Sequence, residues 1–195
     1  MSSKINVIEI ISGHIQSLKT SAGSTLCFAD FFTFYGVPIG FSITGILFDY
    51  NLSENITNIF VNFGSIFTAL LLSVLVLVYD QENKLDDKKE MLERENKLNN
   101  TYDQVPFYGV KKVILNQLYY SICYCVVASM VLVFVATINS IIDAAEASKM
   151  IGEFKFSFDI NTDLLTPISI FLAVNVILTI LMVVKRMHAL LTTNA

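Results

Sequence analysis

The feature that most constrains the fold is a charged segment, residues 80–112, which lies between long apolar stretches. Its 33 residues carry 15 of the chain's 30 Asp, Glu, Lys and Arg side chains, and its first 21 residues contain no Pro or Gly. Glu90 with Arg94 and Glu93 with Lys97 have the acid-first i, i+4 spacing that stabilises an exposed helix. We therefore expect a charged helix that continues the membrane span before it.

Composition places the chain among membrane proteins. It is 54% hydrophobic and only 15% charged, which is unusual for a soluble domain. The net charge of -4, with carboxylates interleaved among the lysines, argues against direct binding of nucleic acid, which needs clustered Lys and Arg.

Four apolar stretches, residues 26–48, 56–79, 113–138 and 165–184, have the length of about 20 residues that a bilayer requires. Eleven of the 13 Lys and Arg residues lie in the N-terminus, the charged segment or the C-terminal tail, so the positive-inside rule predicts that both termini are cytoplasmic. We expect an all-α membrane protein with four transmembrane helices. Its parts are a cytoplasmic amphipathic helix (1–25), a first transmembrane hairpin (26–79), a charged cytoplasmic helix and turn (80–112), a second transmembrane hairpin (113–184) with an outer segment (139–164), and a cytoplasmic tail (185–195).

The N-terminus carries apolar residues at three- and four-residue steps: Ile5, Ile8, Ile11, Ile15 and Leu18. This spacing predicts an amphipathic helix over residues 4–20. Ahead of a span, such a helix is expected to lie flat on the inner leaflet. A helix packed against the protein's own spans is the alternative, and the sequence does not separate the two.

Small and polar residues inside the spans are candidates for helix packing or oligomer contacts, because small side chains let membrane helices approach closely and polar ones bond across them. These candidates are Gly36, Pro38, Gly40, Gly45, Asn62, Gly64, Ala69 and Asn175. Pro38 should also kink the first span. Asp30 lies near the cytoplasmic end of that span, as either a functional intramembrane acid or a solvated interfacial carboxylate.

The outer segment is acidic and contains an alternating pattern. Phe154, Phe156 and Phe158 alternate with polar residues, which predicts a short strand with one apolar face. A lone strand is unstable, so this segment would pair with a second strand, lie on the membrane or meet another copy of the chain. We regard the three phenylalanines as candidates for outer-face assembly, and a packed loop is the alternative.

The charged segment is the only substantial cytoplasmic surface that this layout leaves for a soluble partner. Its apolar stripe is thin, so a contact made there should be largely polar and sensitive to salt. The alternative is a solvated helix with no partner. The candidate docking residues are Leu85, Lys88, Lys89, Met91, Leu92, Arg94, Lys97 and Leu98.

The sequence shows no pattern of residues that would support catalysis. The two histidines, His14 and His188, have no ligand partners at metal-binding spacing. There is also no phosphate-binding glycine loop and no nucleophile elbow. We therefore expect no catalytic residue, no metal and no cofactor. A transporter with matching broken helices is disfavoured, whereas a channel is harder to exclude, although no charged residue lies at mid-membrane depth to form a filter.

The order of segments resembles that of the small four-span membrane proteins of bacterial anti-phage defence systems, and among them the membrane subunits of Kiwa systems. The similar segments are the N-terminal HIQSLKT, a first span with Asp30 and Pro38, the run NIFVNFGSIFTALLLSVLVLVYD before the charged helix, and NQLYYSICY at the start of the third span. The resemblance implies a homo-oligomer, with a tetramer suspected, that detects infection at the inner membrane and holds a cytoplasmic DNA-binding partner.

Three functions fit these observations. The first is a non-enzymatic scaffold or sensor that assembles through its spans, contacts membrane lipid and recruits a cytoplasmic protein. The second is a pore-forming or membrane-depolarising effector. The third is a membrane protein of housekeeping assembly with no link to defence.

Overall fold

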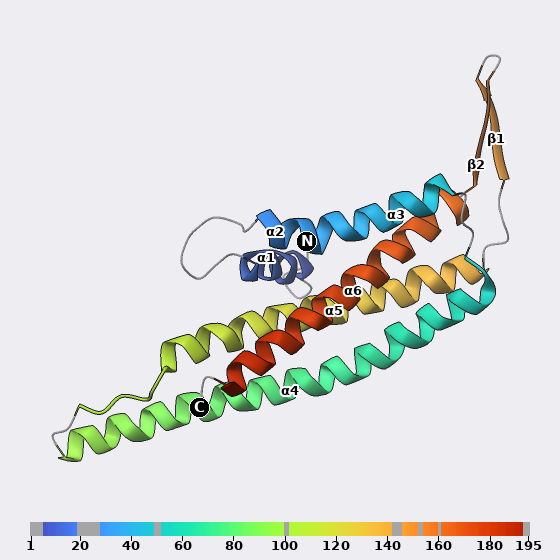
Figure 1. Ribbon diagram of the computed structural model, residues 1–195. Helices are drawn as coiled ribbons and strands as arrows, with labels where there is room; N and C mark the ends of the chain where they lie inside the picture. Colours follow the sequence, from blue (N-terminus) through green and yellow to red (C-terminus); the bar gives the residue numbers. More distant parts are fainter. Residues whose placement is uncertain are drawn as a thin grey trace.

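The computed structural model in Figure 1 describes most of the chain: residues 6–18, 28–48, 52–99, 102–141, 146–151, 154–159 and 161–192. Four helical segments are long and apolar enough to cross a membrane: Ala29–Leu47, Glu54–Asn99, Tyr108–Ile141 and Asp163–Thr192. The prediction of a four-span membrane protein is confirmed at this level.

The elements follow one another as helices with a single pair of strands between the last two spans. In chain order they are α1 (Val7–Ser17), α2 (Phe28–Phe31), the π-helical turn η1 (Phe32–Gly36), α3 (Val37–Leu47), α4 (Glu54–Asn99), α5 (Tyr108–Ile141), β1 (Glu146–Ile151), β2 (Phe154–Asp159), the π-helical turn η2 (Asn161–Leu165) and α6 (Thr166–Thr192). The charged residues from Asp80 onward continue α4 without a break, as expected.

The contact between α4 and α5 is the most extensive one in the helical bundle. The buried residues of α4, Thr57, Gly64, Leu71 and Val78, recur at seven-residue steps. On α5 eight of the eleven buried positions form a series with alternating steps of three and four: Leu115, Leu118, Ile122, Cys125, Ser129, Leu132, Ala136 and Asn139. Ser121, Val126 and Ala128 are buried as well. The two series have the heptad spacings of a coiled coil, so α4 and α5 form a long antiparallel two-helix pair.

The contact face of α4 differs from the one expected from its small and polar residues. Gly64 lies on the face against α5, where a Cβ atom would come within 2.6 Å of Val133 Cγ2. Asn62 and Ala69 are exposed. They stand two and five residues from Gly64, which places them about 160° and 140° away around the helix, and within the described chain Asn62 makes no hydrogen bond to another helix.

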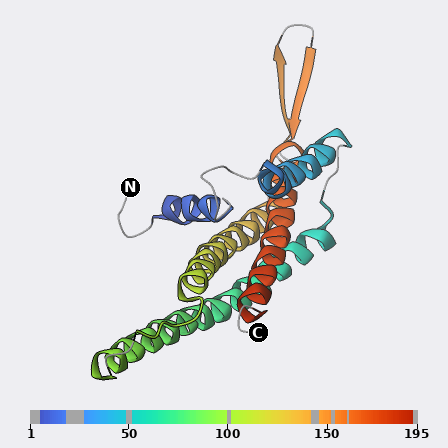
Figure 2. The same ribbon diagram turned by 60° about the vertical axis from the view of Figure 1, so that its left-hand side comes forward.

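The helices form a layer in which α6 packs on α5 and α3 packs on α6 (Figures 1 and 2). Among the described residues, the first span therefore packs on the last one rather than on α4, its neighbour in sequence. Ser42 Oγ donates to the Pro167 carbonyl of α6 at 2.9 Å, and Gly45 lies against Ile170. These contacts hold α3 on the outer side of α6.

The first span is the least regular one. The π-helical turn η1 ends just before Pro38, which is buried in the first turn of α3. The irregularity expected at the proline thus takes the form of a widened turn immediately before it. Gly36 lies beneath the ring of Phe32 in the same span. Gly40 has no atom of a described residue within 4 Å of its Cβ position, so the close approach expected there is not made by the described part of the chain.

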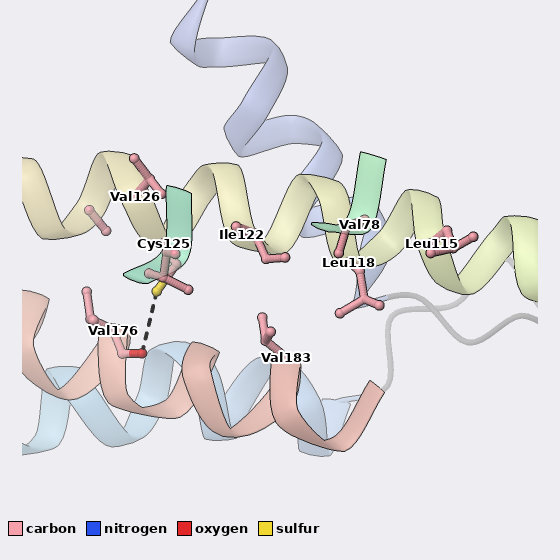
Figure 3. Close-up of a cluster of buried hydrophobic side chains, with 10 residues drawn as sticks. Val78, Leu115, Leu118, Ile122, Cys125, Val126, Val176 and Val183 are labelled. Carbon is pink, nitrogen blue, oxygen red and sulfur yellow. Dashed lines mark hydrogen bonds between the residues drawn. The ribbon is translucent and has the colours of Figure 1, made fainter. Parts of the chain in front are cut away.

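A buried apolar cluster ties α4, α5 and α6 together in the half of the bundle that leads to the charged segment (Figure 3). Val78 of α4 packs against Leu118 and Ile122 of α5, and Cys125 donates its S–H to the Val176 carbonyl of α6 at 3.8 Å. This cluster fixes α5 between its two neighbours.

The strands β1 and β2 form an antiparallel hairpin that projects from the end of the bundle opposite to the charged end of α4 (Figures 1 and 2). In its register Phe154, Phe156 and Phe158 stand opposite Ile151, Lys149 and Ala147. The side chains of the hairpin lie outside the described part of the chain.

The close approach at Gly64 gives a test of the α4–α5 pair. We expect Gly64→Ala to destabilise the protein by about 1–3 kcal/mol, because Val133 and the Ser129 carbonyl leave no room for the added methyl group. Thermal unfolding in detergent would measure this. Gly109→Ala is the matched control, since no atom lies within 4 Å of its Cβ position and alanine favours a helix. Equal melting temperatures for the two variants would contradict the tight seam.

Candidate docking hairpin and a buried polar junction

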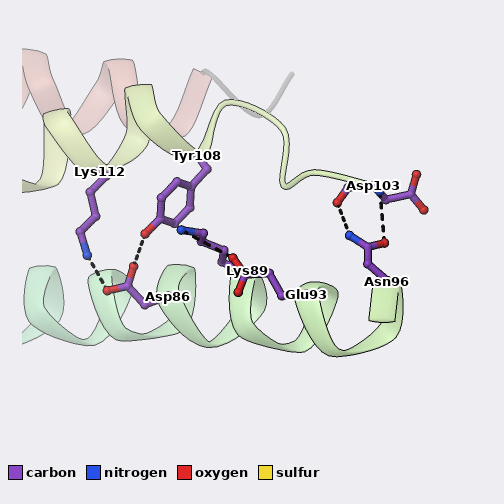
Figure 4. A network of polar contacts seen from close by, with 7 residues as sticks. All are labelled: Asp86, Lys89, Glu93, Asn96, Asp103, Tyr108 and Lys112. Atoms are coloured by element: carbon purple, nitrogen blue, oxygen red, sulfur yellow. Dashed lines mark hydrogen bonds and ion pairs between the residues drawn. The ribbon is translucent and has the colours of Figure 1, made fainter. Parts of the chain in front are cut away.

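The end of α4 and the chain that returns from it form a braced structure, here called the charged hairpin (residues 80–99 and 102–112). Asp86 of α4 accepts hydrogen bonds from the Tyr108 hydroxyl, at 2.7 Å, and from the Lys112 ammonium (Figure 4). Lys112 also pairs with Glu82 at 3.2 Å. One carboxylate on α4 thus holds both a hydroxyl and a cation from the first turns of α5.

A second set of contacts closes the tip. The Asn96 side chain donates to the Asp103 carbonyl at 2.7 Å and accepts from the Asp103 N–H at 3.1 Å (Figure 4). Lys89 lies 4.7 Å from the centre of the Tyr108 ring, a cation–π distance. Residues 102–105 have no helix or strand of their own, and these side-chain contacts fix them against α4.

The turn into α5 is made by a residue in an uncommon backbone conformation. Phe107 has φ 56°, the left-handed region that non-glycine residues adopt at a cost of roughly 1 kcal/mol. The Lys111 N–H donates to the Phe107 carbonyl at 3.0 Å, which starts the hydrogen-bond ladder of α5. The Phe107 ring is left 63% exposed.

Between the two arms of the charged hairpin lies a groove of about 550 Å³. Its walls include Lys89, Leu92 and Glu93 from α4 and Tyr102 and Phe107 from the returning chain. Tyr102 is 96% exposed, so an aromatic side chain stands at the groove with nearly all of its surface in solvent. Such aromatic groups beside a groove are typical anchors for a protein partner.

The predicted docking residues fall on two faces of α4. Leu85, Lys89 and Leu92 face the returning chain, and Lys89 lies 3.7 Å from Glu93. The others point elsewhere: Lys88, Met91, Arg94, Lys97 and Leu98 are all exposed.

Of the two ion pairs expected from spacing, Glu90 with Arg94 is present at 2.9 Å. The other is not: among the described residues Glu93 pairs with Lys89 and not with Lys97. The Lys89 side chain already lies over Tyr108, which keeps it on the groove side beside Glu93.

Sequence reasoning missed Asp86, Asn96, Tyr102 and Tyr108, which shape the charged hairpin. The available signal was the aromatic-rich run of residues 102–108 directly after a charged helix. Its pairing with α4 depends on a contact across the turn that no local periodicity shows.

We expect Asp86→Asn to loosen the charged hairpin, because a neutral amide cannot pair with Lys112 and bonds Tyr108 less strongly. Hydrogen–deuterium exchange of residues 102–112 should speed up by about five-fold, which corresponds to about 1 kcal/mol. Asp87→Asn is the control: Asp87 is exposed and forms no ion pair within the described chain. The same exchange rate in both variants would show that Asp86 does not brace the tip.

A second polar site lies where α1 meets α5 and α6, here called the polar junction (His14, Ser17, Ser121, Tyr124, Asn175 and Arg186). The Arg186 guanidinium of α6 donates to Ser121 Oγ at 2.6 Å, to Ser17 Oγ at 3.3 Å, and to the carbonyl oxygens of Ser17 and Gln117. All four acceptors are uncharged. Arg186 therefore joins the N-terminal helix to the third and fourth spans through charge-assisted hydrogen bonds.

His14 lies at the centre of the same junction. Its ring is fully buried and stacks on Tyr124, with ring centres 4.0 Å apart and planes 2° from parallel. Tyr124 donates to Asn175 Oδ1 at 2.8 Å, and Asn175 donates to the Phe34 carbonyl at 2.8 Å. Asn175, predicted as a packing residue, thus links the first, third and fourth spans.

The structure packs α1 against α5 through a mixed face. His14, Ser17 and Leu18 are buried, whereas Ile8 and Ile11 are 59% and 39% exposed. The first part of the predicted apolar stripe therefore does not cover the protein's own spans, whereas its last residue, Leu18, is buried. Among the described residues, α1 is packed on its own protein, which was one of the two expected positions. Asp30 is exposed and, within the described residues, forms no ion pair.

Neither of the two ring nitrogens of His14 has a hydrogen-bond partner in the described chain. Burial, together with the smaller effect of the nearby Arg186 cation, lowers the pKa of His14 to about 4. The docked α1 therefore holds His14 neutral, next to Tyr124 of α5 and Arg186 of α6, while Tyr120 packs against the neighbouring Gly13.

This arrangement makes the docking of α1 sensitive to acid. His14 has an ordinary pKa of 6.5 when α1 is undocked and about 4 when it is docked, so the undocked form takes up a proton first. Docking is strongest above pH 6.5 and weakens as the pH falls from 6.5 toward 4. At pH 5 the equilibrium constant for docking should be roughly 30-fold lower than at neutral pH. Hydrogen-exchange protection of residues 7–17, corrected for intrinsic rates, would measure it.

His14→Phe keeps a stacked ring but cannot titrate, and should remove this pH dependence. His188→Phe is the control, because His188 is exposed, and this change should leave the pH dependence unchanged. An acid response that persists in His14→Phe would assign the effect to another group.

Within the described residues no group of three His, Cys, Asp or Glu side chains could hold a metal ion. Comparison of the chain with protein family models, curated proteins and solved structures finds no match. The site must therefore be interpreted from its own geometry.

Proposed function

We propose that the protein is a non-enzymatic inner-membrane scaffold or sensor that recruits a soluble cytoplasmic partner through the charged hairpin. The observation that supports this most is the form of that hairpin. It continues α4 and α5 beyond their apolar part as a braced arm, and it carries a groove with an exposed aromatic side chain. A merely solvated helix would need neither the brace nor the groove.

The distribution of basic residues supports a cytoplasmic position for the hairpin, with both termini on the same side, because 11 of 13 Lys and Arg residues lie on these parts. The interleaved acids make a protein partner more suitable than nucleic acid. A DNA-binding partner and a role in anti-phage defence rest on the resemblance described above.

Assembly into a homo-oligomer, with a tetramer suspected, is part of the proposal. α4 packs mainly on α5, and its other faces expose large apolar side chains such as Ile59 and Val76. Gly40 on the outer side of α3 has open space around it and lies between exposed Ile39 and Phe41. A small residue flanked by large ones is a favourable contact point for another membrane helix.

The test is purification of the protein together with the product of the neighbouring gene. Tyr102→Ser should weaken the complex at least ten-fold, because loss of a central aromatic anchor commonly costs more than 1–2 kcal/mol. Its ring is almost wholly exposed, so folding should be unaffected. The complex should also weaken as salt is raised.

Met91→Ser with Leu98→Ser is the matched control, because both side chains are exposed on the side of α4 away from the groove. These changes should leave both the complex and the oligomer mass unchanged. If the double variant loses the partner and Tyr102→Ser keeps it, the docking face lies on the other side of the helix. No effect of either change would refute docking at the charged hairpin.

A pore-forming effector is the second candidate, and one observation favours it. Thr166 and Ser169 at the start of α6 are fully buried, and their hydroxyl oxygens have no partner among the described residues. Unpartnered buried hydroxyl groups are typical binding positions for internal water molecules, which a hydrated path between the helices requires. Measurement of membrane potential during activation separates the candidates, since a scaffold leaves the potential unchanged.

A further inference from the structure

A cavity of about 520 Å³ opens beside the polar junction, between α6, α1 and the start of the first span. Lys185 and Arg186 line one end of it, together with Asp30. Leu178, Leu181 and Met182 line the rest of the α6 wall. No residue that lines this cavity belongs to the charged hairpin. A ligand of the cavity is therefore independent of the partner proposed above.

The cationic end has hydrogen-bond donors that no described residue accepts. Arg186 has five N–H donors, and its bonds to the described residues involve only Nη1 and Nη2. Its Nε–H has no acceptor within the described chain. Lys185 is exposed and forms no ion pair there. Among the described residues that line the cavity, Asp30 is the only acid, so two cations and one carboxylate give this end a net positive charge.

The rest of the wall is apolar and leads toward the middle of the span. Leu178 precedes Arg186 by eight residues, which is about 12 Å along a helix. Leu181 is 60% exposed, so this wall is open to the surroundings of the helix. The cavity therefore has a positive end near the end of α6 and an apolar flank that continues into the membrane-spanning part.

This combination matches one class of ligand. A phosphodiester pairs well with an arginine and a lysine, and an acyl chain can lie along leucine and methionine side chains at membrane depth. Basic pockets between spans on the cytoplasmic side are a known form of anionic lipid site. We propose that this cavity binds the headgroup phosphate of an anionic phospholipid, with one acyl chain along Leu178, Leu181 and Met182.

Such a lipid would lie against Arg186 and the end of α1. It would therefore make the docked position of α1 depend on the composition of the leaflet. The four protein acceptors of Arg186 are uncharged, so the phosphate of the lipid would supply the negative charge that balances the guanidinium.

Native mass spectrometry of the full chain in detergent, with added phosphatidylglycerol or phosphatidylcholine, tests the proposal. Phosphatidylglycerol should bind more tightly. Lys185→Gln should weaken its binding about five-fold, as expected for one basic residue near a lipid surface, and Asp30→Asn should strengthen it by a similar factor. Both side chains are exposed and, within the described residues, unpaired, so these variants should fold.

Lys88→Gln is the control, because it removes one exposed lysine on the charged hairpin, and it should not change lipid binding. Inorganic phosphate is the second probe. If phosphate competes as well as the lipid does, the cavity is a simple anion site and the lipid assignment is wrong. Equal binding of the two lipids, or an unchanged affinity in both Lys185→Gln and Asp30→Asn, would also overturn it.

Discussion

The heptad contact between α4 and α5 determines where everything else in the protein lies. In a membrane the apolar surface of a helix gains little by leaving lipid for protein, so close packing must supply the association energy. Gly64 brings α4 close to Val133 and the Ser129 carbonyl, and Leu71 and Val78 continue the same face. Because this seam runs straight into the charged segment, the direction in which the hairpin projects is set inside the bundle. α5 then presents its other side to α6, which in turn holds the first span.

Beyond the apolar part the physical basis of the pairing changes. The seam continues at Leu85 and Leu92, the next two seven-residue steps of α4, but water now surrounds the helices in the proposed topology, and polar side chains take over. Asp86 binds Tyr108 and Lys112, and Asn96 binds the backbone at Asp103. Each of these contacts is weak when exposed. The α4–α5 seam has already aligned the two segments of the charged hairpin, so these contacts cost little further conformational entropy. Together they keep the groove between the two segments open for a partner.

The sequence was a sufficient guide to the number of spans and to the continuous helix through the charged segment, because long apolar runs and the absence of helix breakers are strong local signals. It was a poor guide to which faces meet. Inside a span nearly every position is apolar, so the contrast that reveals a buried face in a soluble helix is missing. The polar Asn62 and the small Ala69 therefore suggested a seam that lies on the far side of α4. For α1 the pattern left two positions open, and it did not show that His14 and Ser17 are buried while Ile8 and Ile11 are exposed. Arg186 looked like an ordinary residue at a span end, and only the fold brings it to α1.

The polar junction inverts the usual arrangement of a surface helix, and a membrane environment makes this favourable. If Ile8 and Ile11 face lipid, their exposure costs nothing, whereas Ser17 and the backbone at the end of α1 need partners that lipid cannot offer. Arg186 donates hydrogen bonds to these oxygens of α1 and to oxygens of α5. The same bonds stabilise the guanidinium at the end of α6. The two ends of the chain are therefore held by one set of bonds. His14 contributes only while it remains neutral, because a second cation beside Arg186 would meet no carboxylate in the junction. The docking of α1 thus depends on the charge balance at a single point, where a proton and an anionic lipid would act in opposite directions.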